Sequence, residues 1–244
     1  MTNLSAADAL MLGTNKVSAV YAGANKVWHP GYAAVILADL PSAYYRLNDS
    51  SPVALDQTKQ QDGSYVGSYT QDAPSLLPSG HGASLDISGG GGVTVPSHPS
   101  NELGVVPMSI ECWVKLHAAA GGYACLVDNA NRNYSLFFQS SSAWYVGFGG
   151  PGGGGSLSYT AQDWTLPHHF VLTIAPGVTK MYIDGESVTN GTIFPASQVS
   201  STGFSIGMNP SGGGGNLSAQ LQEFALYNYA LSQQQVSDHY GAGL

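Results

Sequence analysis

Short runs of alternating apolar and polar residues, separated by turn-forming residues, recur along most of this 244-residue chain. In the segment SIECWVKL, apolar side chains occupy every second position, at Ile110, Cys112, Val114 and Leu116. Successive side chains of a strand point to opposite faces, so these four predict a strand with one buried face. Short strands divided by Gly, Pro, Asn and Asp are typical of a β-sandwich.

Two consecutive β-hairpins are predicted beyond the middle of the chain. Apolar-rich segments at 170–175, 178–183 and 186–188 are separated first by a Pro-Gly pair and then by Asp184-Gly185. An Asp-Gly pair is a strong hairpin signal, because both residues tolerate the positive φ of a tight turn.

The end of the chain predicts a last strand over 217–227 and then a short helix. Ser232 stands at the expected N-cap, and Gln235 follows three residues later, which is the spacing of a capping box. We expect this helix to end near Tyr240, before Gly241.

The first thirty residues repeat themselves, because GTNKV at 13–17 is followed ten residues later by GANKV at 23–27. The glycines and asparagines favour tight turns, so this ribbon predicts a three-stranded β-meander. So small a sheet buries too little apolar area to offset its chain entropy, and it needs either the following domain or another chain to pack on. The candidate docking residues are its large apolar side chains: Val17, Tyr21, Val27 and Trp28.

His29-Pro30-Gly31 interrupts the strand pattern and marks a boundary, so we divide the chain into an N-terminal ribbon, residues 1–32, and a sandwich domain, residues 33–244. No cationic stretch with a long apolar core opens the sequence, so we expect no signal peptide, no membrane insertion and synthesis in a cytoplasm. In that compartment Cys112 and Cys125 are expected to stay buried thiols.

The chain carries unusually little charge. Asp, Glu, Lys and Arg make up 9% of it, and the net charge of -8 arises mainly because only seven residues are Lys or Arg. An average soluble domain has roughly 25% charged residues. Without clustered cations, binding to nucleic acid or to an anionic membrane surface is not expected.

Eight segments, taken in order, resemble the concanavalin-A-like, laminin-G-type jelly roll. They are YYRL at 44–47, the stretch 56–63, SLDI at 84–87, SIECWV at 109–114, DW at 163–164 with HFVLT at 169–173, MYIDG at 181–185, FSIG at 204–207 and EFALYNYALS at 223–232. The resemblance covers roughly residues 34–242. It implies an all-β, two-sheet antiparallel jelly-roll sandwich, here with a small N-terminal β-meander and a short C-terminal helix, whose rim loops meet ligands.

The opening ribbon is similar to short glycine-and-valine repeats near the ends of minor tail and tail-tip proteins of long-tailed bacteriophages. This similarity implies a virion protein, located in the tail and present as a multi-copy homo-oligomer. Its partners would be other phage tail or virion proteins, with the ribbon docked on the particle and the jelly roll displayed outward.

Resemblance to the glycosidases of this fold would imply carboxylates that alternate along one concave strand. Retaining hydrolysis needs two carboxyl groups about 5 Å apart. The chain has four glutamates, and no two are close enough in sequence to share a strand face: Glu102, Glu111, Glu186 and Glu223. Glu111 is at best a lone half of a dyad, so we expect no enzymatic activity. His168 and His169 are expected to be structural, because adjacent strand residues face opposite ways.

Some relatives in this family hold one calcium ion with rim carboxylates. The resemblance therefore makes three aspartates candidate Ca²⁺ ligands: Asp56, Asp62 and Asp128. Gln222 occupies a position that is commonly acidic in the family, which weakens this assignment. No other cofactor is expected.

Sugar binding would use aromatic rings that stack on a pyranose, with amide or charged partners for its hydroxyl groups. The candidates lie near the second of three four-glycine runs: Tyr123, Asn129, Asn131, Arg132, Trp144 and Tyr145. The alternative interpretation is that Trp144 and Tyr145 are core residues of a strand.

The leading hypothesis is a non-enzymatic phage structural protein, a minor tail or tail-tip component whose lectin-like domain contacts a host-surface glycan or neighbouring subunits. A capsid decoration or head-fibre protein is the alternative, and a glycan hydrolase ranks below both. Whether the ribbon packs on its own sandwich or on another chain stays open at this point.

Overall fold

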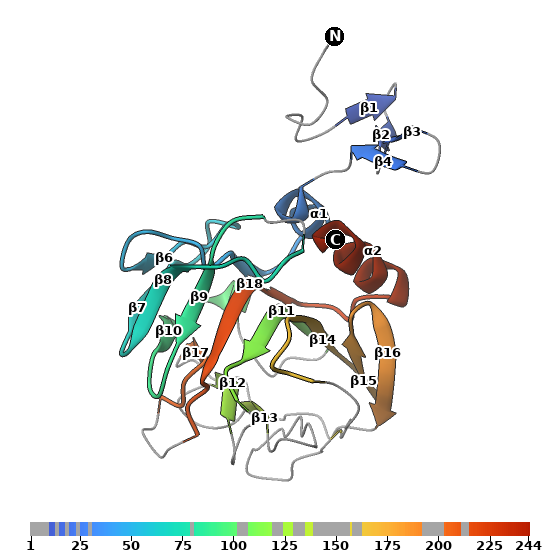
Figure 1. Ribbon diagram of the computed structural model, residues 1–244. Coiled ribbons are helices and arrows are strands. Elements are labelled where there is room, and N and C mark those ends of the chain that lie inside the picture. Colours follow the sequence, from blue (N-terminus) through green and yellow to red (C-terminus); the bar gives the residue numbers. More distant parts are fainter. Residues whose placement is uncertain are drawn as a thin grey trace.

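Two antiparallel β-sheets pack face to face, and two helices cover the outer face of the larger sheet (Figure 1). The computed structural model describes residues 10–12, 15–17, 20–22, 25–28, 31–78, 81–101, 107–118, 124–128, 135–138, 157, 163–191, 203–210 and 215–244. Over these residues the architecture confirms the predicted all-β sandwich.

The larger sheet contains, in the described residues, eight strands. In spatial order they are β16 (Glu186–Gly191), β15 (Val178–Ile183), β14 (His168–Ala175), β11 (Met108–Leu116), β18 (Ala219–Tyr227), β9 (Ser84–Ile87) and β8 (Tyr69–Ala73), and β5 (Ala43–Tyr45) also pairs with β18. The sheet contains both predicted hairpins, since β14, β15 and β16 are consecutive neighbours.

The smaller sheet contains six strands over the described ranges. Their order is β13 (Ser135–Phe138), β12 (Ala124–Asp128), β17 (Phe204–Ile206), β10 (Gly92–Val95), β7 (Gly63–Val66) and β6 (Val53–Ala54). One 3-10 turn, Pro99–Asn101, precedes β11. β6 is the outermost described strand of this sheet, so the loop that follows it lies at an edge of the sandwich.

Strand β11 shows the predicted alternation. Ile110, Cys112 and Val114 lie in the core between the two sheets, whereas Trp113 belongs to a second apolar cluster on the outer face. Glu111 also points to that outer face and is fully buried. Both faces of the strand are therefore covered, one by the smaller sheet and the other by the helices.

A β-bulge in β18 turns two consecutive polar side chains to the outer face. Leu221 and Phe224 belong to the inter-sheet core, whereas Gln222 and Glu223, which stand between them, make outer-face hydrogen bonds. Glu223 has a φ of 57°, and the register against β11 shifts at this point. The extra residue brings a second glutamate to the face that already carries Glu111.

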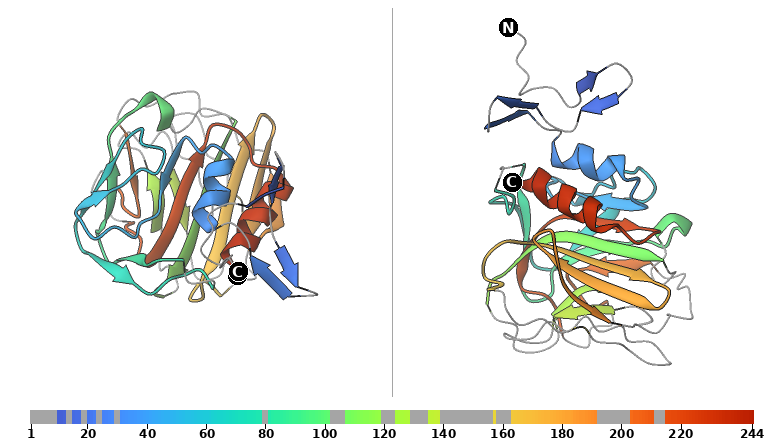
Figure 2. Two further views of the ribbon diagram at one scale, coloured as in Figure 1. Left: turned by 90° about the horizontal axis from the view of Figure 1, so that it is seen from above. Right: turned by 90° about the vertical axis from the view of Figure 1, so that its right-hand side faces the viewer.

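Two α-helices lie side by side on this outer face (Figures 1 and 2). Among the described residues, no helix is long and apolar enough to span a membrane. α1 spans Tyr32–Ala38 and α2 spans Gln233–Gly243. The sequence analysis began the sandwich domain at residue 33 and did not predict that a helix, α1, forms there. The capping box of Ser232 and Gln235 is confirmed, but α2 continues three residues beyond the predicted end.

The N-terminal ribbon differs from the predicted three-stranded meander. It forms two separate hairpins, β1 (Leu10–Leu12) with β2 (Asn15–Val17), and β3 (Val20–Ala22) with β4 (Asn25–Trp28). The outer strands pair as predicted, but the expected central strand is divided between β2 and β3. The described strands of both hairpins lie outside the sandwich, on the side of α1 (Figures 1 and 2).

Candidate functional site

The outer face of the larger sheet carries a sealed polar cluster centred on the carboxylate of Glu111. This carboxylate accepts hydrogen bonds from the hydroxyl groups of Tyr32 at 3.0 Å and Tyr227 at 2.9 Å. The ring nitrogens His169 Nε2, at 2.8 Å, and His239 Nδ1, at 2.9 Å, complete the set. One buried carboxylate thus contacts α1, α2 and two strands of the sheet.

His239 extends this cluster to the end of α1, because its Nε2 lies 2.9 Å from a carboxylate oxygen of Asp39. Burial opposes ionisation of His239, but the charge of Glu111 and the hydrogen bonds that His239 donates to Glu111 and Asp39 outweigh burial and raise its pKa to about 9. Burial likewise acts to raise the pKa of Glu111, but His239 and His169 hold it well below its ordinary value. The geometry is that of a charged His239–Glu111 pair.

A second buried carboxylate, Glu223, lies on the same face. Its Oε1 is 3.1 Å from Arg46 Nη2, and its Oε2 accepts a hydrogen bond from the Tyr44 hydroxyl. Burial raises the pKa of Glu223, whereas the Arg46 guanidinium acts in the opposite direction. The pKa values of Glu111 and Glu223 are therefore displaced in opposite directions.

Sequence spacing suggested that Glu111 has no second glutamate nearby. It missed Glu223 because the two glutamates lie on neighbouring strands of the sheet, β11 and β18. Glu111 and Glu223 are over a hundred positions apart in the sequence, and the β-bulge at Glu223 leaves no simple sequence signal. Two carboxylates with displaced pKa values can form an acid–base pair. Here, however, both are covered by the protein, with 0% and 1% of their surfaces exposed, so no substrate reaches them in this conformation.

His168 and His169 contact different groups, as their neighbouring positions in a strand predicted. His169 belongs to the Glu111 cluster, whereas His168 Nδ1 lies 2.7 Å from a carboxylate oxygen of Asp184 and its Nε2 lies 3.1 Å from the carbonyl of Asp163. Its hydrogen bond to Asp184 raises the pKa of His168, although burial acts to lower it. These contacts support the structural role that we predicted for both histidines.

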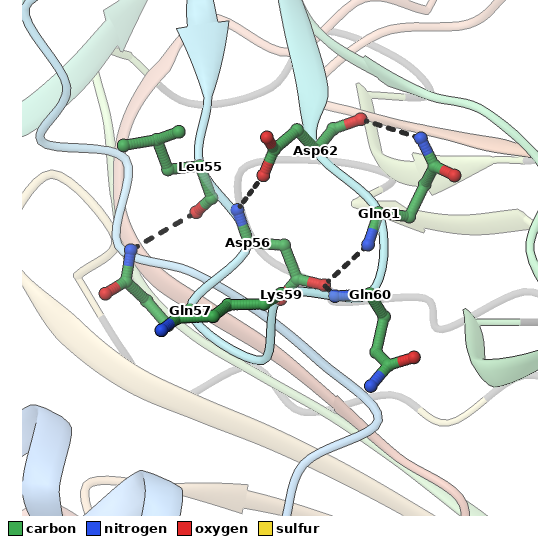
Figure 3. Close-up of a pocket in the computed structure, with 7 residues that line it drawn as sticks. All are labelled: Leu55, Asp56, Gln57, Lys59, Gln60, Gln61 and Asp62. Atoms are coloured by element: carbon green, nitrogen blue, oxygen red, sulfur yellow. Dashed lines mark hydrogen bonds between the residues drawn. The ribbon is translucent and has the colours of Figure 1, made fainter.

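An open hollow of about 490 Å³ lies in the loop between β6 and β7, at the edge of the sandwich (Figure 3). We call it the rim hollow. Its lining residues are Leu55, Asp56, Gln57, Lys59, Gln60, Gln61 and Asp62. The loop places three glutamine side chains, one lysine and one exposed aspartate around a polar depression.

The carboxylate of Asp56 is buried at the centre of this loop and accepts five hydrogen bonds. Oδ1 accepts from the backbone N–H groups of Tyr44 and Thr58, each at 3.0 Å. Oδ2 accepts from the Thr58 hydroxyl at 2.7 Å and from the N–H groups of Gln60 and Gln61, each at 3.1 Å. The loop is folded around this one carboxylate.

The lining side chains differ in how far the loop uses them. The amide nitrogens of Gln57 and Gln61 donate to the backbone carbonyls of Leu55 and Asp62, at 3.4 and 3.3 Å. In the described part of the chain, the Gln60 amide and the Lys59 ammonium have no hydrogen-bond or ion-pair partner, and Figure 3 shows the Gln60 side chain extending away from the bonded loop. These two groups are available to a ligand.

The structure brings two of the three candidate calcium ligands together. Asp62 Oδ1 accepts the backbone N–H of Asp56 at 2.9 Å. Asp128 is buried in β12, and β17, β10 and β7 separate that strand from β6. With strands about 4.8 Å apart, Asp128 lies far from the other two. Within the described residues these three aspartates form no common ligand set, and no group of three or more His, Cys, Asp or Glu side chains is placed to hold a metal ion.

The remaining site predictions are not tested by the structure. Of the docking candidates, Val17 lies on β2, Tyr21 on β3, and Val27 and Trp28 on β4, where the backbone alone is described. All six glycan-binding candidates lie outside the described residues: Tyr123, Asn129, Asn131, Arg132, Trp144 and Tyr145. The sequence analysis selected Asp56 and Asp62 of the rim hollow as calcium candidates but did not single out its glutamines, because it looked for amides only beside aromatic residues.

Two packed antiparallel sheets define an all-β sandwich protein. The profile of the concanavalin A-like lectin/glucanases superfamily matches residues 88–237, which is more than half of the chain. The chain therefore belongs to this family. Among curated protein sequences, none is significantly similar to it.

Solved structures share the fold at low sequence identity. Trypanosoma rangeli sialidase, in complex with 2,3-difluorosialic acid, is 16% identical to this chain, with a TM-score of 0.62. The match covers 81% of this chain and 32% of the sialidase, so the chain spans about a third of that enzyme's length. Domain 4 of AbnA, a GH43 extracellular arabinanase from Geobacillus stearothermophilus, in complex with arabinotriose, is 18% identical with a TM-score of 0.59, over 82% and 98%. The botulinum neurotoxin serotype D/C binding domain is 11% identical with a TM-score of 0.66, over 84% and 53%.

Proposed function

We propose that this chain is a non-enzymatic glycan-binding protein and that its rim hollow contacts the sugar. The observation that carries the proposal is the preformed loop around Asp56, which leaves the Gln60 amide and the Lys59 ammonium free beside an exposed Asp62. Such convergent polar groups around an open depression are suited to the hydroxyl groups of a sugar.

The sealed Glu111 cluster supports the non-enzymatic part of the proposal. A glycosidase needs a carboxylic acid and a carboxylate in contact with the scissile bond. Glu111 and Glu223 are instead saturated by tyrosine, histidine and arginine donors beneath α1 and α2. The hydrogen bonds of Glu111 hold both helices on the sheet.

Two of the similar structures agree with a binding role. The AbnA domain was solved in complex with arabinotriose, and its length is almost entirely covered by this chain. The botulinum neurotoxin similarity is to a binding domain. Because both similarities are below 20% identity, they support the choice of experiment rather than the choice of sugar.

We further propose that the protein is a minor tail or tail-tip component of a bacteriophage, attached to the particle through residues 1–30. The two N-terminal hairpins support this role, because the described strands pair only within their own hairpins and lie outside the sandwich. The alternative is that the protein is a capsid decoration or head-fibre protein, located on the head of the particle. Imaging of assembled particles distinguishes the two, and loss of residues 1–30 is expected to abolish incorporation in either.

A glycan array with the full-length protein tests the binding proposal. We expect selective binding to a set of glycans and weaker binding to the same set by Gln60→Ala and Lys59→Ala. Lys180→Ala, which removes an exposed lysine from β15, is the matched control and is expected to bind like the unmodified protein. Absence of binding, or equal binding by all variants, would overturn the assignment of the rim hollow.

A further inference from the structure

We propose that the rim hollow takes an uncharged, hydroxyl-rich glycan without a metal ion, in a loop that the Asp56 carboxylate organises from within. The inference rests on the proposed glycan-binding function and adds the chemical class of the ligand and its independence of calcium. It differs from what the family resemblance implied, namely a calcium ion held by rim carboxylates.

The first argument is the chemistry of the donors that surround Asp56. Calcium is bound by oxygen ligands, and a coordinating carboxylate must direct lone pairs at the ion. Four N–H groups and one hydroxyl already point at the two oxygens of Asp56. The positive ends of these dipoles occupy the places that a cation would take, so the loop does not fit calcium at Asp56.

The second argument is that the loop is anchored without any ligand. Strand β5 holds it at both ends: Gln57 N donates to the Tyr44 carbonyl at 2.7 Å, and the Tyr45 hydroxyl donates to the Gln61 carbonyl at 2.6 Å. The carboxylate of Asp56 closes the loop between these anchors. A site that is ordered before binding loses less entropy when the ligand arrives, so a metal is not needed to form it.

The third argument is the charge of the groups that face the hollow. Among the described residues that line it, Lys59 is the only cation, whereas Asp56 and Asp62 are two carboxylates, so the lining has no excess of positive charge. An acidic glycan would require an excess of cations, as carboxylate recognition by Arg and Lys illustrates. The amides of Gln57 and Gln60 both donate and accept, which matches the hydroxyl groups of a neutral sugar. Leu55, 46% exposed, adds an apolar contact for sugar carbons.

The experiment uses the full-length chain on an array of paired neutral and uronic- or sialic-acid-containing oligosaccharides, with added calcium chloride and with excess chelator. We expect hits among neutral oligosaccharides, with dissociation constants that agree within about twofold in the two buffers. Loss of one hydrogen bond in Gln60→Ala is expected to weaken binding by roughly tenfold. Gln234→Ala, on the exposed side of α2, is the matched control and is expected to have no effect.

Calcium chloride alone provides a readout that does not need the sugar. We expect it to leave the melting temperature of the unmodified protein unchanged, and Asp56→Asn to lower the melting temperature equally with calcium and with chelator. A calcium-dependent rise that disappears in Asp56→Asn would overturn the inference. If that variant fails to fold, the calcium titration of the unmodified protein still decides the question.

The possible failures are distinguishable. Binding of neutral glycans that is lost in chelator, or binding of acidic glycans only, overturns the inference and leaves the proposed function standing. Absence of binding to any glycan overturns the proposed function, and with it the choice of ligand. In that case the calcium titration still tests whether the loop forms without a metal.

Discussion

At the scale of single residues, Glu111 has the largest structural role on the outer face. Its four hydrogen-bond donors come from α1, β14, β18 and α2. A buried carboxylate with this set of partners orders the elements around it, because each donor would be left unsatisfied in its absence. The arrangement makes the free energy of unfolding sensitive to one side chain.

We predict that Glu111→Gln lowers the free energy of unfolding by roughly 3 to 5 kcal/mol, since the change removes the fully buried carboxylate partner of the His239 cation and leaves it only the partly exposed Asp39. The measurement is urea unfolding followed by tryptophan fluorescence. Glu186→Gln, on the exposed edge strand β16, is the control and is expected to change stability by less than about 0.5 kcal/mol. A loss below about 1 kcal/mol for Glu111→Gln would contradict the role assigned to the cluster.

The pKa of His239 predicts a loss of stability in alkali. Its folded-state pKa of about 9 lies above the ordinary value of 6.5, so the stabilisation is fully present below pH 6.5 and is lost as the pH rises through 9. The linked change is on the order of 3 kcal/mol. His168, whose pKa is also raised, contributes with the same sign. We expect the free energy of unfolding, measured between pH 6 and pH 10, to depend less on pH in His239→Gln than in the unmodified protein. The same pH dependence in both proteins would refute the assignment.

Part of this residue-scale picture could be predicted. The alternation in β11 correctly assigned Glu111 to the face opposite Ile110 and Cys112, because strand periodicity is a local property. Its partners could not be predicted, because they stand 58 to 128 positions away and depend on which strands and helices become neighbours. The five donors to Asp56 were not foreseen for a different reason: they stand only 2 to 12 positions away, but the conformation of the loop decides which of them converge on the carboxylate.

At the scale of elements, helix α2 illustrates what local signals decide. The Ser232 hydroxyl accepts the N–H of Gln235, as the spacing predicted, because a capping box is formed within four residues. The C-terminal end was mispredicted at Gly241. The helix continues to Gly243, where a Cβ atom would lie 2.4 Å from the Trp113 ring, so packing against the sheet extends the helix beyond its local stop signal.

We predict that Ser232→Ala destabilises the protein by about 1 kcal/mol, the typical loss for an N-cap side chain. Differential scanning calorimetry at constant pH is a suitable measurement. The control is Ser97→Ala, which removes an exposed hydroxyl outside any helix. Equal melting temperatures for the two variants would mean that α2 is held by packing alone.

Helix α1 was missed for identifiable reasons. Gly31 precedes it without a side-chain cap, and Val35 and Ile36 are β-branched. An apolar run of seven residues cannot be distinguished from a buried strand by periodicity alone. Tertiary contacts with the outer face, such as those of Tyr32 and Ile36, stabilise the helix.

At the scale of the whole molecule, the family resemblance correctly predicted the two-sheet sandwich because the order of short strands and turns spans the chain. The predicted number of strands in the N-terminal ribbon was wrong, since β2 and β3 belong to two separate hairpins. The site residues proposed near the second glycine run lie outside the described residues, so that hypothesis stays a prediction.

We predict that a chain starting at Gly31 keeps the melting temperature of the full-length protein, because the described hairpin strands pair only within their own hairpins. A chain starting at Ser42 lacks α1 and exposes the face that Tyr32 and Ile36 cover. Burial of two such side chains contributes roughly 3 to 6 kcal/mol, so this chain should unfold at a clearly lower temperature. Similar melting for both truncated chains would show that α1 is dispensable.

The position of α1 between the hairpins and the sheet also determines how the protein bears mechanical load. Tension applied through the hairpins enters the sandwich at Gly31 and passes along α1. From there the Tyr32–Glu111 bond transmits it to β11 and the Asp39–His239 contact transmits it to α2. Both routes lead into the same buried carboxylate cluster, so a pull on the N-terminal segment is resisted by side chains that are fully buried in the fold.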